Sequence, residues 1–336
     1  DSSVPAELPD LLVVLIITFA FGFGLAVKQA GLPPLVGFLA AGFALNAWGA
    51  ELGLPSETSD ILKYIAHLGV LLLLFTVGLK LKLKSLIQPE VIGGGLVHFV
   101  VSCLFLTPLI IVIGGLDPRT SLLLAIALAF SSTVLAAKVL EAKRELKAFH
   151  GRVTIGILII QDLIALAVLS FFGDHSPSPW ALALFALPLV RPVIHKLLDL
   201  SGHDELLVLM GMLLSLVIGG MGFETLGLSS ELGALVMGML LADHRRTQEL
   251  AKALWSLKEV FLVGFFLQIG LAGLPDPQSL LFALAMGALL PLKGALFVAL
   301  LLFFGLRARN AFLAALSLAC YSEFGLIIAA SLLPEW

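Results

Sequence analysis

Charged residues are scarce in this sequence. Asp, Glu, Lys and Arg together make up 13% of its 336 residues, and hydrophobic residues make up 60%. A typical soluble domain carries about 25% charged residues. The mean hydropathy is +1.08. The composition therefore excludes a soluble globular protein and predicts a polytopic membrane protein that has the lipid bilayer as its first partner.

Cysteine is equally scarce. The two cysteines, Cys103 and Cys320, lie within apolar stretches and form no metal-binding or redox motif. The run Gly93-Gly94-Gly95 lacks the lysine and the following Ser or Thr of a phosphate-binding loop, and instead permits close packing of helices. We expect no cofactor and no nucleic-acid partner.

Long hydrophobic runs, by contrast, recur from one end of the sequence to the other. About 20 apolar residues make one crossing of a bilayer. On this basis the sequence predicts twelve spans, at residues 9–28, 32–48, 60–80, 90–113, 119–140, 151–172, 179–198, 204–221, 230–242, 256–272, 278–305 and 310–333. The connections are too short to separate domains, so we expect a single all-α transmembrane transport domain over residues 1–336.

The basic residues are distributed unevenly between the two sets of connections. Alternate connections hold Lys28, Lys80, Lys82, Lys84, Lys138, Lys143, Arg144, Lys147, Arg152, Arg191, Lys196, Arg245, Arg246, Lys252, Lys258, Arg307 and Arg309. The opposite connections carry acidic residues and a single base, Arg119. Because cytoplasmic loops are enriched in Lys and Arg, this pattern predicts a multi-pass membrane protein with its N-terminus outside. We expect the membrane to be a bacterial inner membrane.

A glycine pattern occurs twice. The segment Gly31-Leu-Pro-Pro-Leu-Val-Gly37-Phe-Leu-Ala-Ala-Gly42 shares its three glycines with residues 227–238, at an offset of 196. A second echo pairs residues 130–133 with 320–323, at an offset of 190. Seven predicted spans separate the copies, and an odd number turns the second copy upside down, as in the inverted repeats of secondary transporters. The second repeat then lacks one of five helices, so we expect a thirteenth span beyond Trp336.

One carboxylate lies in the middle of a predicted span. Asp162, preceded by Gln161, stands in an otherwise apolar run over residues 153–172. An aspartate at that depth costs about +2.5 to +3.5 kcal/mol on insertion scales and is a functional-site hypothesis by default. A carboxylate and an amide oxygen side by side suit an alkali cation, and burial lets a proton compete with it. The pair predicts a site that alternates between cation and proton. A buried aspartate that only packs against a base is the alternative.

Polar residues interrupt the fifth predicted span at 131–133 and the twelfth at 321–325. Their occurrence at related positions favours two discontinuous helices whose freed carbonyls face an ion. Polar side chains bonded back to their own helix are the alternative. The residues expected to line the site with the Gln-Asp pair are Ser131, Ser132, Thr133, Ser322 and Glu323. Of these, Glu323 would offset the positive ends of the half-helices.

Lys293 is the only base in the middle of a predicted span. A lysine at that depth needs a carboxylate partner, and Asp162 and Glu323 are the candidates. Paired with Asp162, Lys293 would have to be displaced by an arriving cation or proton, which couples ion binding to the charge of the site. A static structural pair is the alternative.

At these residues the sequence resembles the membrane domain of the Kef-type members of the monovalent cation:proton antiporter-2 family. The resemblance is carried by Gly37-Phe-Leu-Ala-Ala-Gly42, Gly69-Val-Leu-Leu-Leu-Leu-Phe-Thr-Val-Gly78-Leu, Phe130-Ser-Ser-Thr133, Gln161-Asp162-Leu, Gly227-Leu-Ser and Ser322-Glu323-Phe. Single motifs are generic, but their order and spacing along nearly the whole chain are specific.

The resemblance implies the inverted-repeat fold of sodium/proton antiporters, with two crossed discontinuous helices. It implies core helices at about 90–172 and 278–333 that move against a homodimer scaffold at about 9–80 and 179–272. Asp162 matches the family's ion-binding aspartate, and Gln161 matches the glutamine of Kef-type proteins, which favours potassium over sodium. Residues 131–133, Ser322, Glu323 and Lys293 match the crossing and its neighbouring lysine. The resemblance leaves open a cytoplasmic regulatory domain or an ancillary subunit as partner.

The function expected from the sequence is potassium efflux in exchange for protons by alternating access at Asp162. A sodium/proton antiporter and a gated, channel-like potassium pathway are the alternatives. An enzyme is not expected, because intramembrane catalysis needs a nucleophile–base pair or metal ligands at one depth. The intramembrane histidines His67 and His98 stand alone, and such residues more often pack than bind a ligand.

Overall fold

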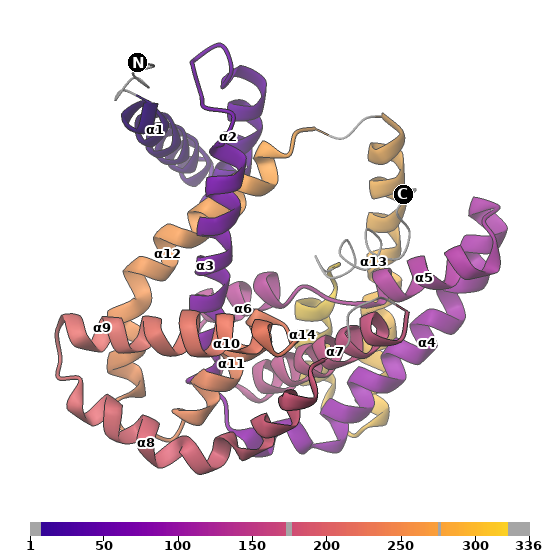
Figure 1. The fold of residues 1–336 in the computed structure, drawn as a ribbon. Coiled ribbons are helices and arrows are strands. Elements are labelled where there is room, and N and C mark those ends of the chain that lie inside the picture. The colour runs from indigo at the N-terminus through magenta and orange to yellow at the C-terminus, as the bar shows by residue number, and fades with distance from the viewer. Residues whose placement is uncertain (1–7, 173–176, 275–276, 322–336) are drawn as a thin grey trace. The chain divides into compact units, whose positions relative to one another are not determined.

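The computed structural model describes residues 8–172, 177–274 and 277–321, and every regular element in those ranges is a helix (Figure 1). The first half comprises α1 (Leu8–Gln29), α2 (Pro34–Trp48), α3 (Thr58–Gly78), η1 (Leu83–Ile87), α4 (Pro89–Gly114), α5 (Pro118–Ala129), α6 (Thr133–Ala142) and α7 (Phe149–Phe172). The second half comprises η2 (Pro179–Ala186), α8 (Leu187–Leu200), α9 (Glu205–Met212), η3 (Leu213–Met221), α10 (Gly222–Thr225), α11 (Ser230–Leu240), α12 (Thr247–Leu271), α13 (Pro277–Phe303) and α14 (Ala308–Leu318). The all-α fold class is confirmed.

Apolar length accounts for most of these helices. Within the described residues, eight helical segments are long and apolar enough to cross a membrane, judged by length and composition. The helices α2 and α11 are shorter, with 15 and 11 residues, and they carry the repeated glycine pattern. The count of twelve spans stays a prediction.

The start of α12 differs from the sequence-based boundary. The helix begins at Thr247, although the apolar run that predicted it begins at residue 256. Lys252, predicted to lie in a connection, therefore belongs to the helix. Lys258, counted with the same connection although it stands at the start of the predicted span, is 1% exposed. A hydropathy criterion misses this start because it ignores the charged first turns of an amphipathic helix.

The chain divides into two compact units. One comprises residues 1–72 and 252–283, and the other comprises residues 73–251 and 284–336. Of the residues expected at the ion site, the described ones (131–133, Gln161, Asp162 and Lys293) fall in the second unit. The proposed division into core and scaffold helices is a separate matter and stays a prediction.

Glycines bring the helices of the first unit into close contact. At Gly37 of α2, an added Cβ would lie 2.6 Å from the Cα of Gly24 in α1. At Gly42, further along α2, an added Cβ would lie 2.8 Å from the Cα of Gly270 in α12. Neither position has room for a side chain, so both glycines set how closely the backbones approach.

The second unit contains two packed groups of helices. In one group, α4 packs against α5 and α7, and α7 also contacts α6 and α14. In the other group, α11 packs against the π-helical segment η3, where Gly233 meets Gly219, and against the end of α3, where Gly238 meets Gly78.

At the start of α5, Asp117 accepts the N–H of Thr120 at 3.1 Å, and hydrogen bonds from Thr120 lower the pKa of that carboxyl.

Candidate ion-binding site at a helix break

The site is built on an interruption between α5 and α6. The first helix ends at Ala129, Phe130 is extended (φ −78°, ψ 149°), and the second helix begins at Thr133. The hydroxyl of Ser132 caps α6 by accepting the N–H of Leu135 at 3.3 Å. The polar triplet at 131–133 thus coincides with a break, as the sequence predicted, and all three of its residues are buried.

Gln161 holds this break from the neighbouring helix. The backbone N–H of Ser131, freed by the end of α5, donates to Oε1 of Gln161 in α7 at 2.8 Å. Gln161 is 1% exposed, and the Nε2 atom of its amide has no hydrogen-bond partner among the residues that the structure describes. The amide oxygen, expected to face a cation, is already engaged, which leaves one lone pair for a ligand. Its role as an ion ligand stays a prediction.

Asp162 follows directly on α7 and is buried, with 9% of its surface exposed. Thr133 lies at the opposite edge of the break, where its Oγ1 is buried and has no hydrogen-bond partner among the described residues. Asp162 and Thr133 therefore belong to two helices, α7 and α6, that pack against each other, and Ser131 and Ser132 lie in the break before α6. A buried acid and a buried hydroxyl on adjoining helices are groups that can bind either a monovalent cation or a proton.

The segment after α14 meets the break. That helix ends at Leu318, whose carbonyl accepts the hydroxyl of Ser131 at 2.7 Å. The N–H of Ser132 donates to Sγ of Cys320 at 3.4 Å. Residues more than 180 positions apart are thereby joined at one point. Ser322 and Glu323, expected here as well, lie outside the described residues.

Lys293 of α13 joins the two segments through their carbonyls. Its Nζ donates to the carbonyl oxygen of Phe130 and to that of Cys320, at 2.7 Å each, and lies 5.1 Å from the ring centre of Tyr321. We expected a carboxylate partner, but the acceptors found in the described part of the chain are backbone oxygens. The physical reason is that a helix leaves its last carbonyls unpaired, and these carry partial negative charge.

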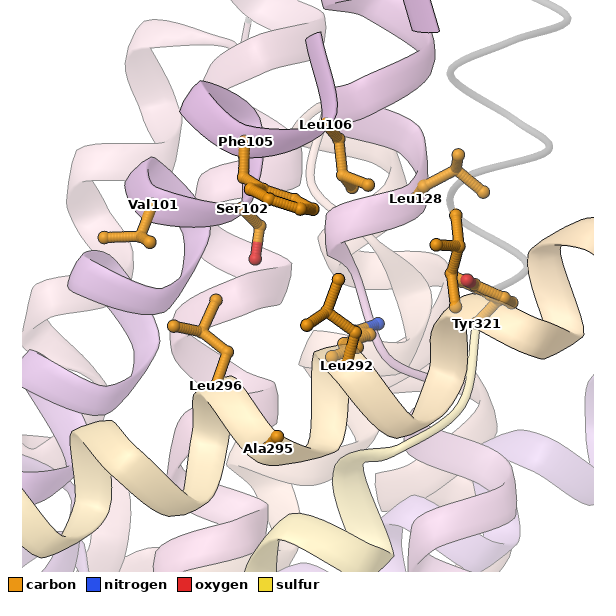
Figure 2. Close-up of a pocket in the computed structure, with 11 residues that line it drawn as sticks. Val101, Ser102, Phe105, Leu106, Leu128, Leu292, Ala295, Leu296 and Tyr321 are labelled. Carbon is orange, nitrogen blue, oxygen red and sulfur yellow. The ribbon is translucent and has the colours of Figure 1, made fainter. Parts of the chain in front are cut away.

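A cavity of about 320 Å³ adjoins Lys293 between α4, α5 and α13 (Figure 2). Its walls are mostly apolar, and its polar members are Ser102, Lys293 and Tyr321. Ser102 also approaches Nδ1 of His98, at 3.3 Å. The imidazole of His98 is fully buried and stacks on the ring of Phe297, with centroids 3.3 Å apart. This cavity could not be predicted from the sequence, because leucines that line a cavity cannot be distinguished by sequence from leucines that face lipid.

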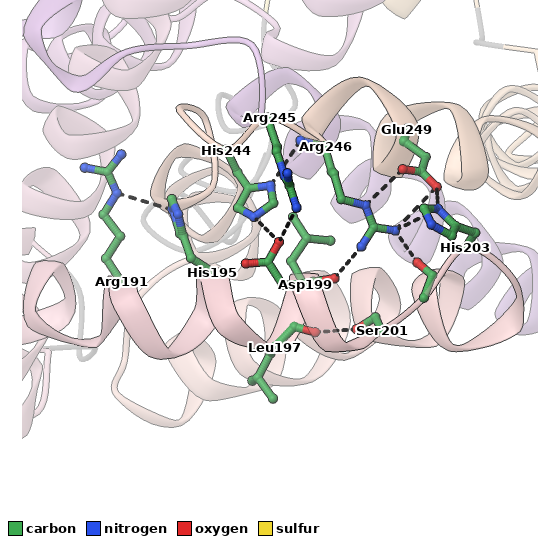
Figure 3. Close-up of polar contacts among 12 residues, drawn as sticks. Arg191, His195, Leu197, Asp199, Ser201, His203, His244, Arg245, Arg246 and Glu249 are labelled. Atoms are coloured by element: carbon green, nitrogen blue, oxygen red, sulfur yellow. Dashed lines mark hydrogen bonds and ion pairs between the residues drawn. The ribbon is translucent and has the colours of Figure 1, made fainter.

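A separate charged cluster joins α8 to the start of α12 (Figure 3). Its members are Arg191, His195, Asp199, His203, Asp243, His244, Arg245, Arg246 and Glu249. The side chain of Arg246 is 11% exposed and donates to Glu249 at 3.0 Å and to the carbonyl of Leu198 at 2.8 Å. Its neighbour Arg245 is 84% exposed. Their place in a predicted connection predicts that both arginines are solvated charge, and this prediction is wrong for Arg246.

These features define a helical membrane fold with an interrupted helix over a buried acid. Residues 13–335 match the family model described as sodium/hydrogen exchanger, transmembrane. The chain belongs to this family.

The resemblance to Kef-type proteins is also confirmed. The chain is 29% identical over 266 residues to the glutathione-regulated potassium-efflux system protein KefC of Enterobacter sp. (strain 638), and equally to that of Escherichia coli O17:K52:H18 (strain UMN026 / ExPEC). In both cases the match covers 73% of this chain and 42% of the relative, so the chain spans less than half the length of these relatives.

A solved structure supports the fold. The sodium proton antiporter MjNhaP1 from Methanocaldococcus jannaschii superposes with a TM-score of 0.62 at 15% sequence identity. The superposition covers 96% of this chain and 85% of that protein. The relatives named in these comparisons are transport proteins.

Proposed function

We propose that this chain is a secondary active antiporter of a bacterial inner membrane, which exchanges a monovalent cation for protons by alternating access at Asp162. The observation that carries the proposal is the buried Gln161–Asp162 pair, held against the α5–α6 break by the 2.8 Å hydrogen bond to Ser131. A buried carboxylate has to be neutralised, and a proton or a cation can each do so. If the proton and the cation compete for this carboxylate, the protein exchanges one for the other.

Potassium is the cation that we propose first. The relatives named KefC are described as potassium-efflux system proteins. The resemblance to Kef-type proteins also implies that Gln161 matches their glutamine. Sodium is the second candidate, because the family model and MjNhaP1 are described by sodium/proton exchange. A gated, channel-like efflux of potassium through the same residues is the third.

We assign distinct roles around the carboxylate. Asp162 binds the cation or the proton, assisted by Gln161 and by oxygens at Ser131, Ser132 and Thr133. The buried hydroxyl of Thr133, which has no partner in the described part of the chain, supports a ligand role for that residue. Lys293, Ser322 and Glu323 compensate charge at the helix ends.

An inverted repeat is part of this proposal, and glycine contacts support it. Gly42 contacts Gly270, and Gly238 contacts Gly78. Gly238 follows Gly42 by 196 residues and Gly270 follows Gly78 by 192 residues, so the two contacts join equivalent positions of the two copies. Twelve spans in the present sequence, an outside N-terminus, a thirteenth span and a homodimer scaffold around α2 and α11 complete the proposed architecture. A cytoplasmic regulatory domain or ancillary subunit is compatible with relatives of more than twice the matched length.

Proton flux in proteoliposomes tests the function. Addition of potassium or sodium in turn to wild-type vesicles should dissipate a pH gradient with saturable dependence on the cation. Asp162→Asn should lose this flux at least about 100-fold, since its amide neither carries charge nor exchanges a proton. Asp60→Asn is the matched control, because Asp60 is exposed on α3 beside Lys63. Undiminished flux in Asp162→Asn would refute the proposal, and single-channel currents would favour the pore.

A further inference from the structure

Three groups surround the ammonium of Lys293, and we call them the carbonyl cradle: the carbonyl oxygens of Phe130 and Cys320 and the ring of Tyr321. Both oxygens lie 2.7 Å from Nζ, and the ring centre lies 5.1 Å away. The hydroxyl of Tyr321 donates to the carbonyl of Met286 in α13 at 2.7 Å, which fixes the ring on the same helix as the lysine. The cradle is therefore assembled by contacts that do not involve the ammonium.

The two carbonyls do not depend on lysine for their position. Phe130 is the extended residue that follows α5, and Cys320 follows the end of α14. Their segments are tied to each other by the Ser131–Leu318 and Ser132–Cys320 hydrogen bonds. A pair of carbonyl oxygens converging on one point in an apolar region is costly unless something positive or a donor fills that point.

The geometry matches a particular size of cation. Nitrogen–oxygen distances of 2.7 Å are those of a charge-assisted hydrogen bond from an ammonium. Backbone carbonyls are also the ligands that replace the hydration shell of potassium in channels, and a potassium ion is close to ammonium in size. The face of an aromatic ring adds attraction for any cation above it.

We propose that the carbonyl cradle is a binding seat for a monovalent cation of ammonium or potassium size, and that the Lys293 side chain is its tethered occupant. Removal of that side chain opens the seat. The adjoining cavity of about 320 Å³ has room for a small ion or for a short alkylammonium, and it is lined by Lys293 itself. Binding at this seat is separate from exchange at Asp162.

Thermal unfolding of purified protein tests the seat directly. Lys293→Ala is compared in sodium, potassium, ammonium and n-butylammonium chlorides of equal ionic strength, with choline chloride as the reference. Ammonium, n-butylammonium and potassium should each raise the Tm of Lys293→Ala by about 2 °C or more over choline, and sodium should raise it less. Wild type should not respond to ammonium or n-butylammonium, because its own ammonium fills the seat, and a potassium response of wild type reports the site at Asp162.

Lys293→Met is the matched control. Methionine also lacks the charge, but its long apolar side chain occupies the opening, so ammonium and n-butylammonium should not stabilise this variant, and potassium should stabilise it no more than it stabilises wild type. If Lys293→Ala folds only when ammonium ions are present during purification, that result supports the seat. An equal response to all cations, including choline, would overturn it, and so would failure to recover folded Lys293→Ala in any of the salts.

A second substitution separates the seat from the exchange site. In Lys293→Ala combined with Asp162→Asn, the ammonium and potassium response should persist, since the carbonyl cradle contains no atom of Asp162. Loss of the response in the double variant would show that the cation binds at the carboxylate and would refute the seat. Loss of exchange in Asp162→Asn alone bears on the proposed function and leaves the seat unaffected.

Discussion

The helix break and the charged cluster are polar networks of the second unit, and their hydrogen bonds are made in different ways. At the break, Lys293 and Gln161 serve backbone groups that the ended helices leave unpaired. In the cluster, side chains of opposite charge mainly serve each other, and several are exposed to solvent. At the break, specific side chains replace the hydrogen bonds that the interrupted membrane helix has lost.

The largest difference should appear at Lys293. Lys293→Ala leaves two partly buried carbonyls without a donor. Because an unpaired buried polar group costs about 1–3 kcal/mol, the free energy of unfolding should fall by about 2 kcal/mol. Lys63→Ala, an exposed lysine on α3, should change it by less than about 0.5 kcal/mol. Chemical denaturation in detergent measures both. Equal effects of the two substitutions would contradict the bridging role of Lys293.

Lys293→Ala also tests whether the lysine has a role in ion exchange. If Lys293 also couples ion binding to charge, the pH profile of exchange in Lys293→Ala should shift relative to wild type. Proton-flux assays over a pH series measure it. An unchanged profile would make the lysine a purely structural link between the two segments.

A smaller effect is expected at Gln161. Gln161→Leu removes the acceptor of the Ser131 N–H, and a buried unpaired donor costs about 1–3 kcal/mol. The matched control is Gln88→Leu, because Gln88 is an exposed glutamine whose amide donates to Lys84 at 3.3 Å. Denaturation should separate the two variants. A Gln161→Leu protein as stable as Gln88→Leu would show that the break is held by other contacts.

The charged cluster should give the smallest effects and the strongest dependence on salt. Arg246→Ala should lower the free energy of unfolding more than Arg245→Ala does, because the side chain of Arg246 is 11% exposed and that of Arg245 is 84% exposed. High salt should narrow the gap between the two variants, since partly exposed charges are screened. High salt should leave the loss of unfolding free energy in Lys293→Ala largely unchanged. If the difference in stability between Arg246→Ala and Arg245→Ala does not depend on salt, the two networks do not differ in the way described.

Much of the fold could be predicted from the sequence, because apolar runs and polar interruptions are visible in it. The runs marked the helices, and the Ser131–Thr133 triplet marked the break between α5 and α6. The burial of Asp162 followed from its place in the run at 153–172. These predictions succeeded where the side chains themselves carry the signal.

The partners of Lys293 could not be predicted, because every residue has a backbone carbonyl and residue identity does not show which carbonyls are left without a hydrogen bond. The same holds for Gln161, whose oxygen was expected to face an ion but accepts the N–H of Ser131. Arg245 and Arg246 are identical in type and adjacent, so the sequence alone does not separate the exposed one from the enclosed one. The ion ligands and the inverted repeat remain predictions.

Proton release on cation binding is the most direct test of the central claim, which is that one carboxylate is shared between a cation and a proton. Potassium is added to purified wild-type protein in weakly buffered detergent solution at a pH where Asp162 is protonated, and the released protons are counted. The account predicts a saturable release from wild type that weakens as the pH falls, and no release from Asp162→Asn. Equal release from both proteins would contradict it.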